Sequence, residues 1–211
     1  MTRFLDRREA GLALGGLLSD RSFVHPVVLG LPRGGVPVAD EVARLIDAPF
    51  DVLVVRKLGM PGHEELAMGA VGEGGSIVLN REVITAAGIS AEQVDRAEMR
   101  ERAEVERRTA LFRDGRPRIT LVGREAIVVD DGLATGATAR AACRVARAQG
   151  AERIVLAVPV APHGTSGAFD EADETFCLTE PRDFMSVGMH YVDFTQVDDG
   201  EVTDILRSGG E

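Results

Sequence analysis

The sequence predicts a doubly wound α/β fold with a mostly parallel sheet. Short apolar runs of strand length alternate with segments of helical periodicity, which is the pattern of parallel strands joined by crossover helices. The strand-like runs are 27–31, 51–55, 126–129, 154–158 and 175–178. No repeat, low-complexity tract or linker divides the 211 residues, so we expect one domain over 1–211. Ligands of such folds bind beyond the carboxyl ends of the strands.

The first third of the chain has the pattern helix, strand, helix, strand. Apolar residues recur at helical spacing over 6–18, and a second helical pattern covers 38–46, between the first two predicted strands. A glycine-rich region follows. There we expect a long mobile loop over about 58–75, which leads into a small strand pair at 67–71 and 76–79.

A strongly charged helix is expected to begin after Ser90. Ser90 and Gln93 have the spacing of a capping box, and three Glu/Arg pairs follow at i,i+4 on the helix body. These pairs are Glu92/Arg96, Glu98/Arg102 and Glu104/Arg108. We interpret this face as solvent-exposed, and the stretch of about 81–118 as a helical insertion. The remaining predicted helices are 137–149, a short one near 165–172 and a closing one at 201–206.

The composition argues against several classes of function. The formal net charge is −10 and the isoelectric point is near 5.0, so we expect no nucleic-acid partner and no membrane partner. The sequence has no run of 18 apolar residues and no signal-peptide pattern, which predicts a cytoplasmic protein. Its two cysteines, Cys143 and Cys177, are too few for a disulfide framework and lack metal-ligand spacing.

The segment 127–138 has the strongest chemical signal. An apolar strand ends in the adjacent carboxylates Asp130 and Asp131, and a turn of small residues then enters a helix N-terminus. Unpaired N–H groups over 134–138 suit a phosphate dianion, and the carboxylates can accept sugar hydroxyls or hold a hydrated hard cation. The alternative is an ordinary strand-to-helix turn with an acidic N-cap. A Walker A loop is excluded because no Gly-Lys-Ser/Thr follows.

This segment resembles the phosphoribosyl-pyrophosphate signature of the type I phosphoribosyltransferases. The resemblance implies that Asp130 and Asp131 hold the ribose hydroxyls and, through these hydroxyls and water, a Mg²⁺ ion. It also implies that the following loop binds the 5′-phosphate. The loop residues are Ala134, Thr135, Gly136, Ala137 and Thr138.

A second segment, 30–35, is similar to the pyrophosphate loop of the same family. Members of that family often hold a non-proline cis peptide in this loop. The resemblance therefore implies a cis bond between Pro32 and Arg33, and it places Arg33, Gly34 and Gly35 at the pyrophosphate.

A third similarity follows the second predicted strand. Arg56 and Lys57 stand where some family members carry basic residues that grip the pyrophosphate, and Lys57 is the only lysine of the chain. The mobile loop expected after them would close over the ligand and exclude water.

A fourth segment, about 179–196, is similar to the base-recognition hood of the 6-oxopurine branch. That resemblance implies that Phe184 stacks on a flat base and that Asp193 reads its edge. The alternative is that Phe184 and Tyr191 are plain core aromatics. Two departures argue against a 6-oxopurine acceptor. No lysine stands shortly before the hood, and Ala134 occupies the position of the branch's aspartate base.

The resemblance as a whole implies a phosphoribosyltransferase-type fold with a small hood and a helical insertion. It implies an enzyme of nucleotide salvage that transfers the phosphoribosyl group from Mg²⁺-phosphoribosyl pyrophosphate to a nitrogenous base. Arg33, Lys57, Asp130 and Asp131 are the expected catalytic residues, and a homodimer is the expected assembly. Two alternatives stay open: a regulatory protein that only binds the ligand, which Ala134 favours, and an unrelated doubly wound sugar-phosphate enzyme.

Overall fold

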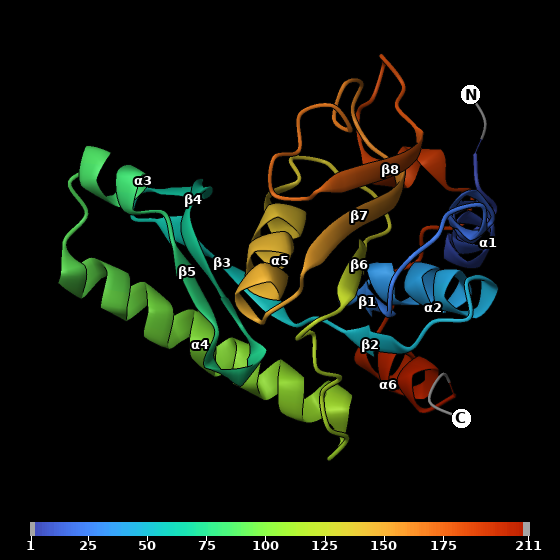
Figure 1. Ribbon diagram of the computed structural model, residues 1–211. Helices are drawn as coiled ribbons and strands as arrows, with labels where there is room; N and C mark the ends of the chain where they lie inside the picture. Colours follow the sequence, from blue (N-terminus) through green and yellow to red (C-terminus); the bar gives the residue numbers. More distant parts are fainter. Residues whose placement is uncertain (1–2, 209–211) are drawn as a thin grey trace.

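A five-stranded parallel sheet forms the centre of the protein, as the computed structural model shows (Figure 1). The structure describes residues 3–208, so the ends of the predicted domain lie outside it. The strands are β1 (Pro26–Gly30), β2 (Phe50–Val52), β6 (Glu125–Val129), β7 (Arg153–Val160) and β8 (Glu174–Thr179). Their order is β2-β1-β6-β7-β8, and every neighbouring pair is parallel. The doubly wound parallel sheet is therefore confirmed.

Helices cover both faces of this sheet (Figure 1). Side chains of α1 (Arg7–Ser19), α2 (Gly35–Leu45) and α6 (Asp199–Ser208) share one buried cluster with one face of the strands. Side chains of α5 (Ala137–Ala148) share a second cluster with the other face. Alternate residues of each strand point to opposite faces, so the continuous apolar runs of the strands supply both clusters.

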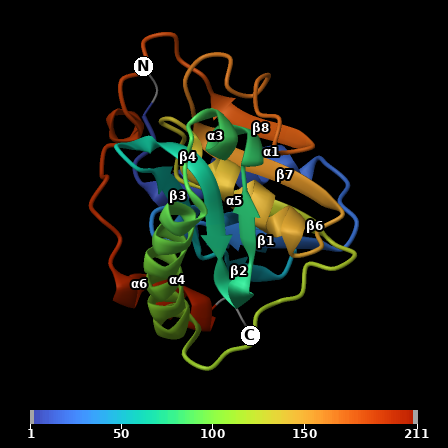
Figure 2. The same cartoon turned by 90° about the vertical axis from the view of Figure 1, so that its left-hand side faces the viewer.

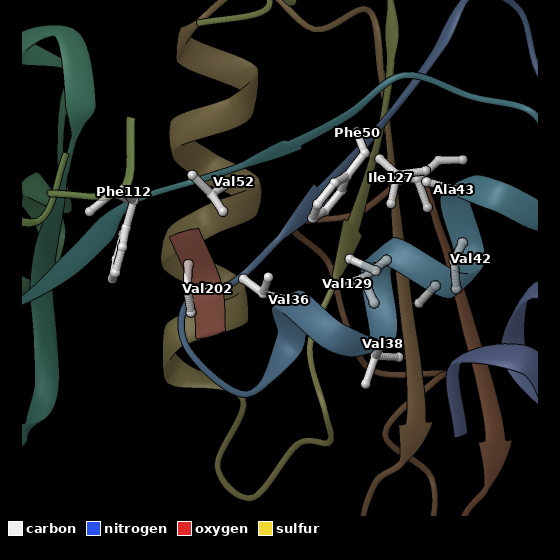
Figure 3. Packing of buried hydrophobic residues seen from close by; sticks show 14 of the residues in the cluster. Val36, Val38, Val42, Ala43, Phe50, Val52, Phe112, Ile127, Val129 and Val202 are labelled. Carbon is white, nitrogen blue, oxygen red and sulfur yellow. The ribbon is translucent and has the colours of Figure 1, made fainter. Parts of the chain in front are cut away.

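Figure 3 shows the packing of the first cluster. Val36 and Val42 come from α2, Ile127 and Val129 from β6, and Val202 from α6; all five are buried. Full burial of one such side chain contributes about 1.5–3 kcal/mol relative to leaving it exposed. The packing holds the ends of β1 and β6 firmly, and the candidate site lies at those ends.

A second, antiparallel sheet occupies the region where the sequence suggested a long mobile loop. It consists of β3 (Val55–Met60), β4 (His63–Gly72) and β5 (Ile77–Leu79), with a 3-10 turn at Glu73–Gly75. The mobile loop over 58–75 is therefore wrong, whereas the strand pair predicted at 67–71 and 76–79 is confirmed by β4 and β5. The glycines of this region serve close packing. A Cβ on Gly69 would lie 2.5 Å from the Val78 carbonyl oxygen, and one on Gly72 would lie 2.3 Å from the Val145 side chain.

The charged segment of about 81–118 folds into two helices, α3 (Arg81–Ala86) and α4 (Ala91–Arg113), and α4 runs along the small sheet (Figure 2). The capping box of Ser90 and Gln93 is confirmed, and so are the three predicted i,i+4 ion pairs. The helix is not exposed all round, however. Val94, Val105 and Phe112 are buried against the rest of the protein, so α4 has a packed face as well as a charged one.

A buried ion-pair group attaches the end of α4 to both sheets. The Arg113 guanidinium donates to both Glu73 carboxylate oxygens at 2.6 and 2.7 Å and to both Asp51 oxygens at 3.1 and 3.2 Å. Asp51 also accepts the Ile119 N–H at 3.0 Å. Asp51 belongs to β2 and Glu73 follows β4, so one arginine ties α4 to the central and the small sheet.

The C-terminal part of the chain differs from the sequence prediction at one helix. The expected helix near 165–172 is absent, and turns take its place. The Glu180 carboxylate accepts the Gly164 and Ser166 N–H groups at 3.1 and 2.7 Å, and Gly164 has a φ of +82°, which a helix does not allow. The closing helix is present as α6. Within residues 3–208, no helix is both long and apolar enough to cross a bilayer.

Candidate active site

Two loops meet at the carboxyl edge of the sheet, one after β1 and one after β6. Glycine is required where they touch, because a Cβ on Gly34 would lie 2.0 Å from a carboxylate oxygen of Asp131. A Cβ on Gly35 would lie 2.8 Å from the Asp130 Cα. The expected cis peptide bond between Pro32 and Arg33 is present. The structure thus brings the predicted pyrophosphate loop and the acidic pair into direct contact.

The surroundings of the acidic pair oppose the ionisation of both carboxyl groups. Burial and the adjacent charge of Asp131 raise the pKa of Asp130, and burial raises the pKa of Asp131 although Arg7 opposes this. One Asp130 oxygen accepts the backbone N–H of Asp131 at 2.9 Å. Two neighbouring carboxylates that resist ionisation together favour a ligand that brings hydroxyl donors or positive charge.

Arg7 is a site residue that the sequence analysis missed. Its Nε donates to Asp131 at 2.8 Å, and one Nη donates to the Thr195 carbonyl at 2.8 Å. Its guanidinium lies 4.0 Å from the centre of the Phe194 ring. Arg7 therefore links α1, the acidic pair and the hood. No motif marks it, since it lies 124 residues from Asp131 in a chain rich in arginine.

The predicted phosphate loop lies at the N-terminus of α5. Gly136 caps the helix with a φ of +71°, a left-handed conformation that glycine adopts without steric cost. The Thr135 hydroxyl accepts the Ala137 N–H at 3.4 Å, and Ala134, Thr135 and Thr138 are exposed. The first-turn N–H groups have no partner within the helix, so they and the helix dipole can receive an anion.

A pocket of about 250 Å³ lies beside this loop and contains the predicted cations Arg56 and Lys57. Pro32 and Thr138 line it as well, which places it between the two loops. Its opposite wall is α4, which contributes three charged residues, and the sequence analysis placed one of them, Arg108, on a solvated face. The three residues are Arg100, Glu101 and Arg108.

Arg33 does not line this pocket. Its guanidinium is directed toward α6, where it lies 3.7 Å from the Asp199 carboxylate. The predicted role of Arg33 at the pyrophosphate therefore needs a side-chain rotation, whereas Arg56 and Lys57 line the pocket as they stand.

The hood segment lies against the acidic pair. The Tyr191 hydroxyl donates to the Asp131 carbonyl at 2.6 Å, and burial raises the pKa of this phenol, so it remains a donor. Phe184 is half-buried and stacks on His190 with ring centres 5.5 Å apart. Asp193 is exposed and accepts from the Thr195 N–H and hydroxyl, which lower its pKa. One face of Phe184 is thus already covered by a side chain.

The two carboxylates of the acidic pair suit a cation that takes most of its ligands from water and substrate. Among residues 3–208, no group of three or more His, Cys, Asp or Glu side chains is arranged to hold a metal. Mg²⁺ typically takes one or two carboxylates and completes its shell with water and substrate phosphates. Asp130 and Asp131 fit that mode of binding.

A parallel sheet with helices on both faces defines the doubly wound α/β class, whose ligands bind beyond the carboxyl ends of the strands. Residues 3–192 match the family described as the phosphoribosyl transferase domain, and the chain belongs to this family. Two curated proteins of Mycobacterium tuberculosis, from strains H37Rv and CDC 1551, are each 52% identical over 207 residues. The first is named "Putative phosphoribosyl transferase Rv0571c". The alignments cover 98% of this chain and 47% of the relatives, so the chain spans about half their length.

A solved structure is similar over the whole chain. The protein TT1426 from Thermus thermophilus is 42% identical, and the two structures superpose with a TM-score of 0.93 over 100% of both chains. Because the similarity covers both whole chains, the two proteins share the arrangement of the central sheet, the small sheet and α4.

Proposed function

We propose that the protein is a phosphoribosyltransferase that uses Mg²⁺-phosphoribosyl pyrophosphate and transfers its phosphoribosyl group to a nitrogenous base, with release of pyrophosphate. One observation supports this above all. The acidic pair, the phosphate loop and the pocket with Arg56 and Lys57 adjoin one another at the carboxyl edge of the sheet. In the donor the ribose carries the 5′-phosphate on C5 and the pyrophosphate on C1, so three adjoining sites could bind its three parts at the same time.

Each part of the site has a distinct task in the proposed reaction. Asp130 and Asp131 accept the ribose hydroxyls, and the loop 134–138 binds the 5′-phosphate through backbone N–H groups. Arg56 and Lys57 neutralise the charge that develops on the departing pyrophosphate. Asp130 and Asp131 would hold Mg²⁺ through ribose hydroxyls and water, and the ion would supply further charge neutralisation. The rate enhancement rests on positioning and electrostatics, since no covalent step falls to the protein.

Calorimetric titration of phosphoribosyl pyrophosphate with and without Mg²⁺ tests the donor site. We expect Mg²⁺-dependent binding of micromolar strength or better, about −8 kcal/mol. Asp130→Asn/Asp131→Asn should abolish it, whereas Asp20→Asn/Asp47→Asn removes two exposed charges and should leave it intact. Full affinity in the first double variant would remove the basis of the proposal.

A regulatory binding protein is the second candidate, and Ala134 is the observation that favours it. This residue stands at the start of the phosphate loop, exposed, and it has no group that can move a proton. Incubation with Mg²⁺, the donor and a panel of nucleobases separates the candidates. Release of pyrophosphate that depends on one base supports the enzyme; tight donor binding without release under any base supports the regulator.

Membership of the family is also the basis for proposing an acceptor, an oligomeric state and a cellular location. The partly exposed Phe184 ring and Asp193 are proposed to bind a small flat base, other than a 6-oxopurine, in a salvage reaction. A homodimer in the cytoplasm is the assembly and location we propose. Size-exclusion chromatography with light scattering tests the dimer directly.

A further inference from the structure

The insertion helix α4 contributes a wall to the pocket beside the phosphate loop. Arg56 and Lys57 of β3 line one side, and Arg100, Glu101 and Arg108 of α4 line the other. Four cationic side chains and one carboxylate thus surround a space of about 250 Å³. The chain as a whole has a formal net charge of −10, so this concentration of positive charge is local.

The wall is held firmly to the scaffold. Phe112 and Val105 of α4 are buried in the same cluster as β3 and β4 side chains, and Arg113 fixes the helix end to both sheets. Glu101 adds a direct link to β3, because it accepts from Arg56 Nε at 2.9 Å. These attachments distinguish α4 from a flexible charged segment at the surface.

The same Glu101 carboxylate holds two of the pocket arginines at once. It accepts from Arg56 Nε through one oxygen and from Arg100 Nε through the other, both at 2.9 Å. Burial opposes the ionised form of Glu101, but the bonds from both arginines outweigh it and lower its pKa. The carboxylate therefore stays charged and holds one edge of each guanidinium beside the pocket.

Arg108 is also paired, yet its partner is shared. Glu104 accepts from Arg108 Nε at 2.6 Å and from Arg107 at 2.9 and 3.0 Å. One carboxylate thus serves two arginines, so Glu104 alone does not neutralise both of them. An anion with several oxygens would match such a set of donors, since guanidinium groups bind phosphates through paired N–H bonds.

We propose that Arg100 and Arg108 of α4 bind the pyrophosphate group of the donor, together with Arg56 and Lys57. The insertion helix then forms a fixed wall of the leaving-group site, opposite Arg56 and Lys57. This inference rests on the proposed function, since it assigns residues within the same donor site.

Calorimetric titration of three probes into the same variants tests the assignment. The probes are Mg²⁺-pyrophosphate, ribose 5-phosphate and phosphoribosyl pyrophosphate. Arg100→Ala and Arg108→Ala should each weaken pyrophosphate and donor binding about tenfold, the scale of a lost hydrogen bond to a charged group at a partly exposed site. Binding of ribose 5-phosphate should not change. Arg102→Ala is the matched control, because Arg102 lies on α4 beside Gly75 and away from the pocket.

The outcomes separate this inference from the proposed function. Donor binding that is equal in wild type and in Arg100→Ala/Arg108→Ala overturns the inference and leaves the proposed function standing. A parallel loss of ribose 5-phosphate binding also overturns it, because the arginines would then act at the other end of the site or through the fold. Absence of donor binding by the wild type overturns both. Circular dichroism of each variant confirms that α4 remains folded.

Discussion

Arg113→Ala should destabilise the protein strongly. The arginine makes four bonds of 2.6–3.2 Å to the carboxylates of Glu73 and Asp51, and the side chains of these three residues are between 2% and 10% exposed. Its removal leaves two buried negative charges without their shared cation. Breaking a buried pair in this way costs about 3–5 kcal/mol. For a chain of this length, that corresponds to a fall of roughly 10 °C in the unfolding midpoint.

Thermal unfolding followed by circular dichroism at pH 7 measures the effect. Arg107→Ala is the control on the same helix, since that side chain is 58% exposed, and its unfolding midpoint should stay nearly unchanged. Adding Glu73→Gln to Arg113→Ala should recover part of the loss, because it removes one uncompensated charge. A loss below about 1 kcal/mol, or no recovery in the double variant, would refute the reasoning from buried charge.

Three further predictions concern packing, acid stability and thiol reactivity. Gly35→Ala should lower the free energy of unfolding by about 1–3 kcal/mol in a denaturant titration, because its Cβ would lie 2.6 Å from a backbone oxygen of β6. A Cβ on Gly16 would meet nothing within 4 Å, so Gly16→Ala should stabilise α1. Equal effects of the two substitutions would contradict the role of close packing at Gly35. Burial lowers the pKa of His190, so the free energy of unfolding of the wild type should fall as the pH drops below about 6.5. His190→Phe should lose less stability over the same pH range. Parallel pH profiles of stability for the two proteins would argue against this role of His190. Burial raises the pKa of Cys143 and Cys177 to about 12, so iodoacetamide at pH 8 should modify them only in denaturant, and mass spectrometry of the folded protein checks this.

The parallel sheet could be predicted from the sequence because most of its strands contain short apolar runs, several of them rich in β-branched residues. Strand β6, for example, reads Glu-Ala-Ile-Val-Val and directly precedes the acidic pair. Of the small sheet, only the pair at 67–71 and 76–79 could be predicted, and the segment before it was expected to be a loop. Gly69 and Gly72 of β4 are also typical of loops, and only the approach of β5 and α5 shows that they are needed for packing. The absent helix near 165–172 has a comparable cause, since the Glu180 carboxylate holds that segment in turns.

The residues of the candidate site also differ in whether the sequence could predict them. Asp130, Asp131 and the loop 134–138 are contiguous, so the sequence presents them together. Arg7 and Arg108 come from distant elements and carry no local signal. The i,i+4 pairing of Arg108 with Glu104 is in fact typical of a solvated helix face. Its position beside the pocket depends on how α4 docks, which is decided by tertiary contacts such as those of Arg113.

The two bonds of Arg7 have a consequence for the synthesis of the chain. Asp131 and Thr195 lie 124 and 188 residues beyond Arg7, so α1 leaves the ribosome long before its partners exist. Chains are made from the N-terminus and fold largely in that order. The sheet and the phosphate loop can form first, but the link from α1 through the acidic pair to the hood closes only after residue 195 has emerged. The part of the candidate site around the acidic pair is therefore among the last parts of a new molecule to be completed.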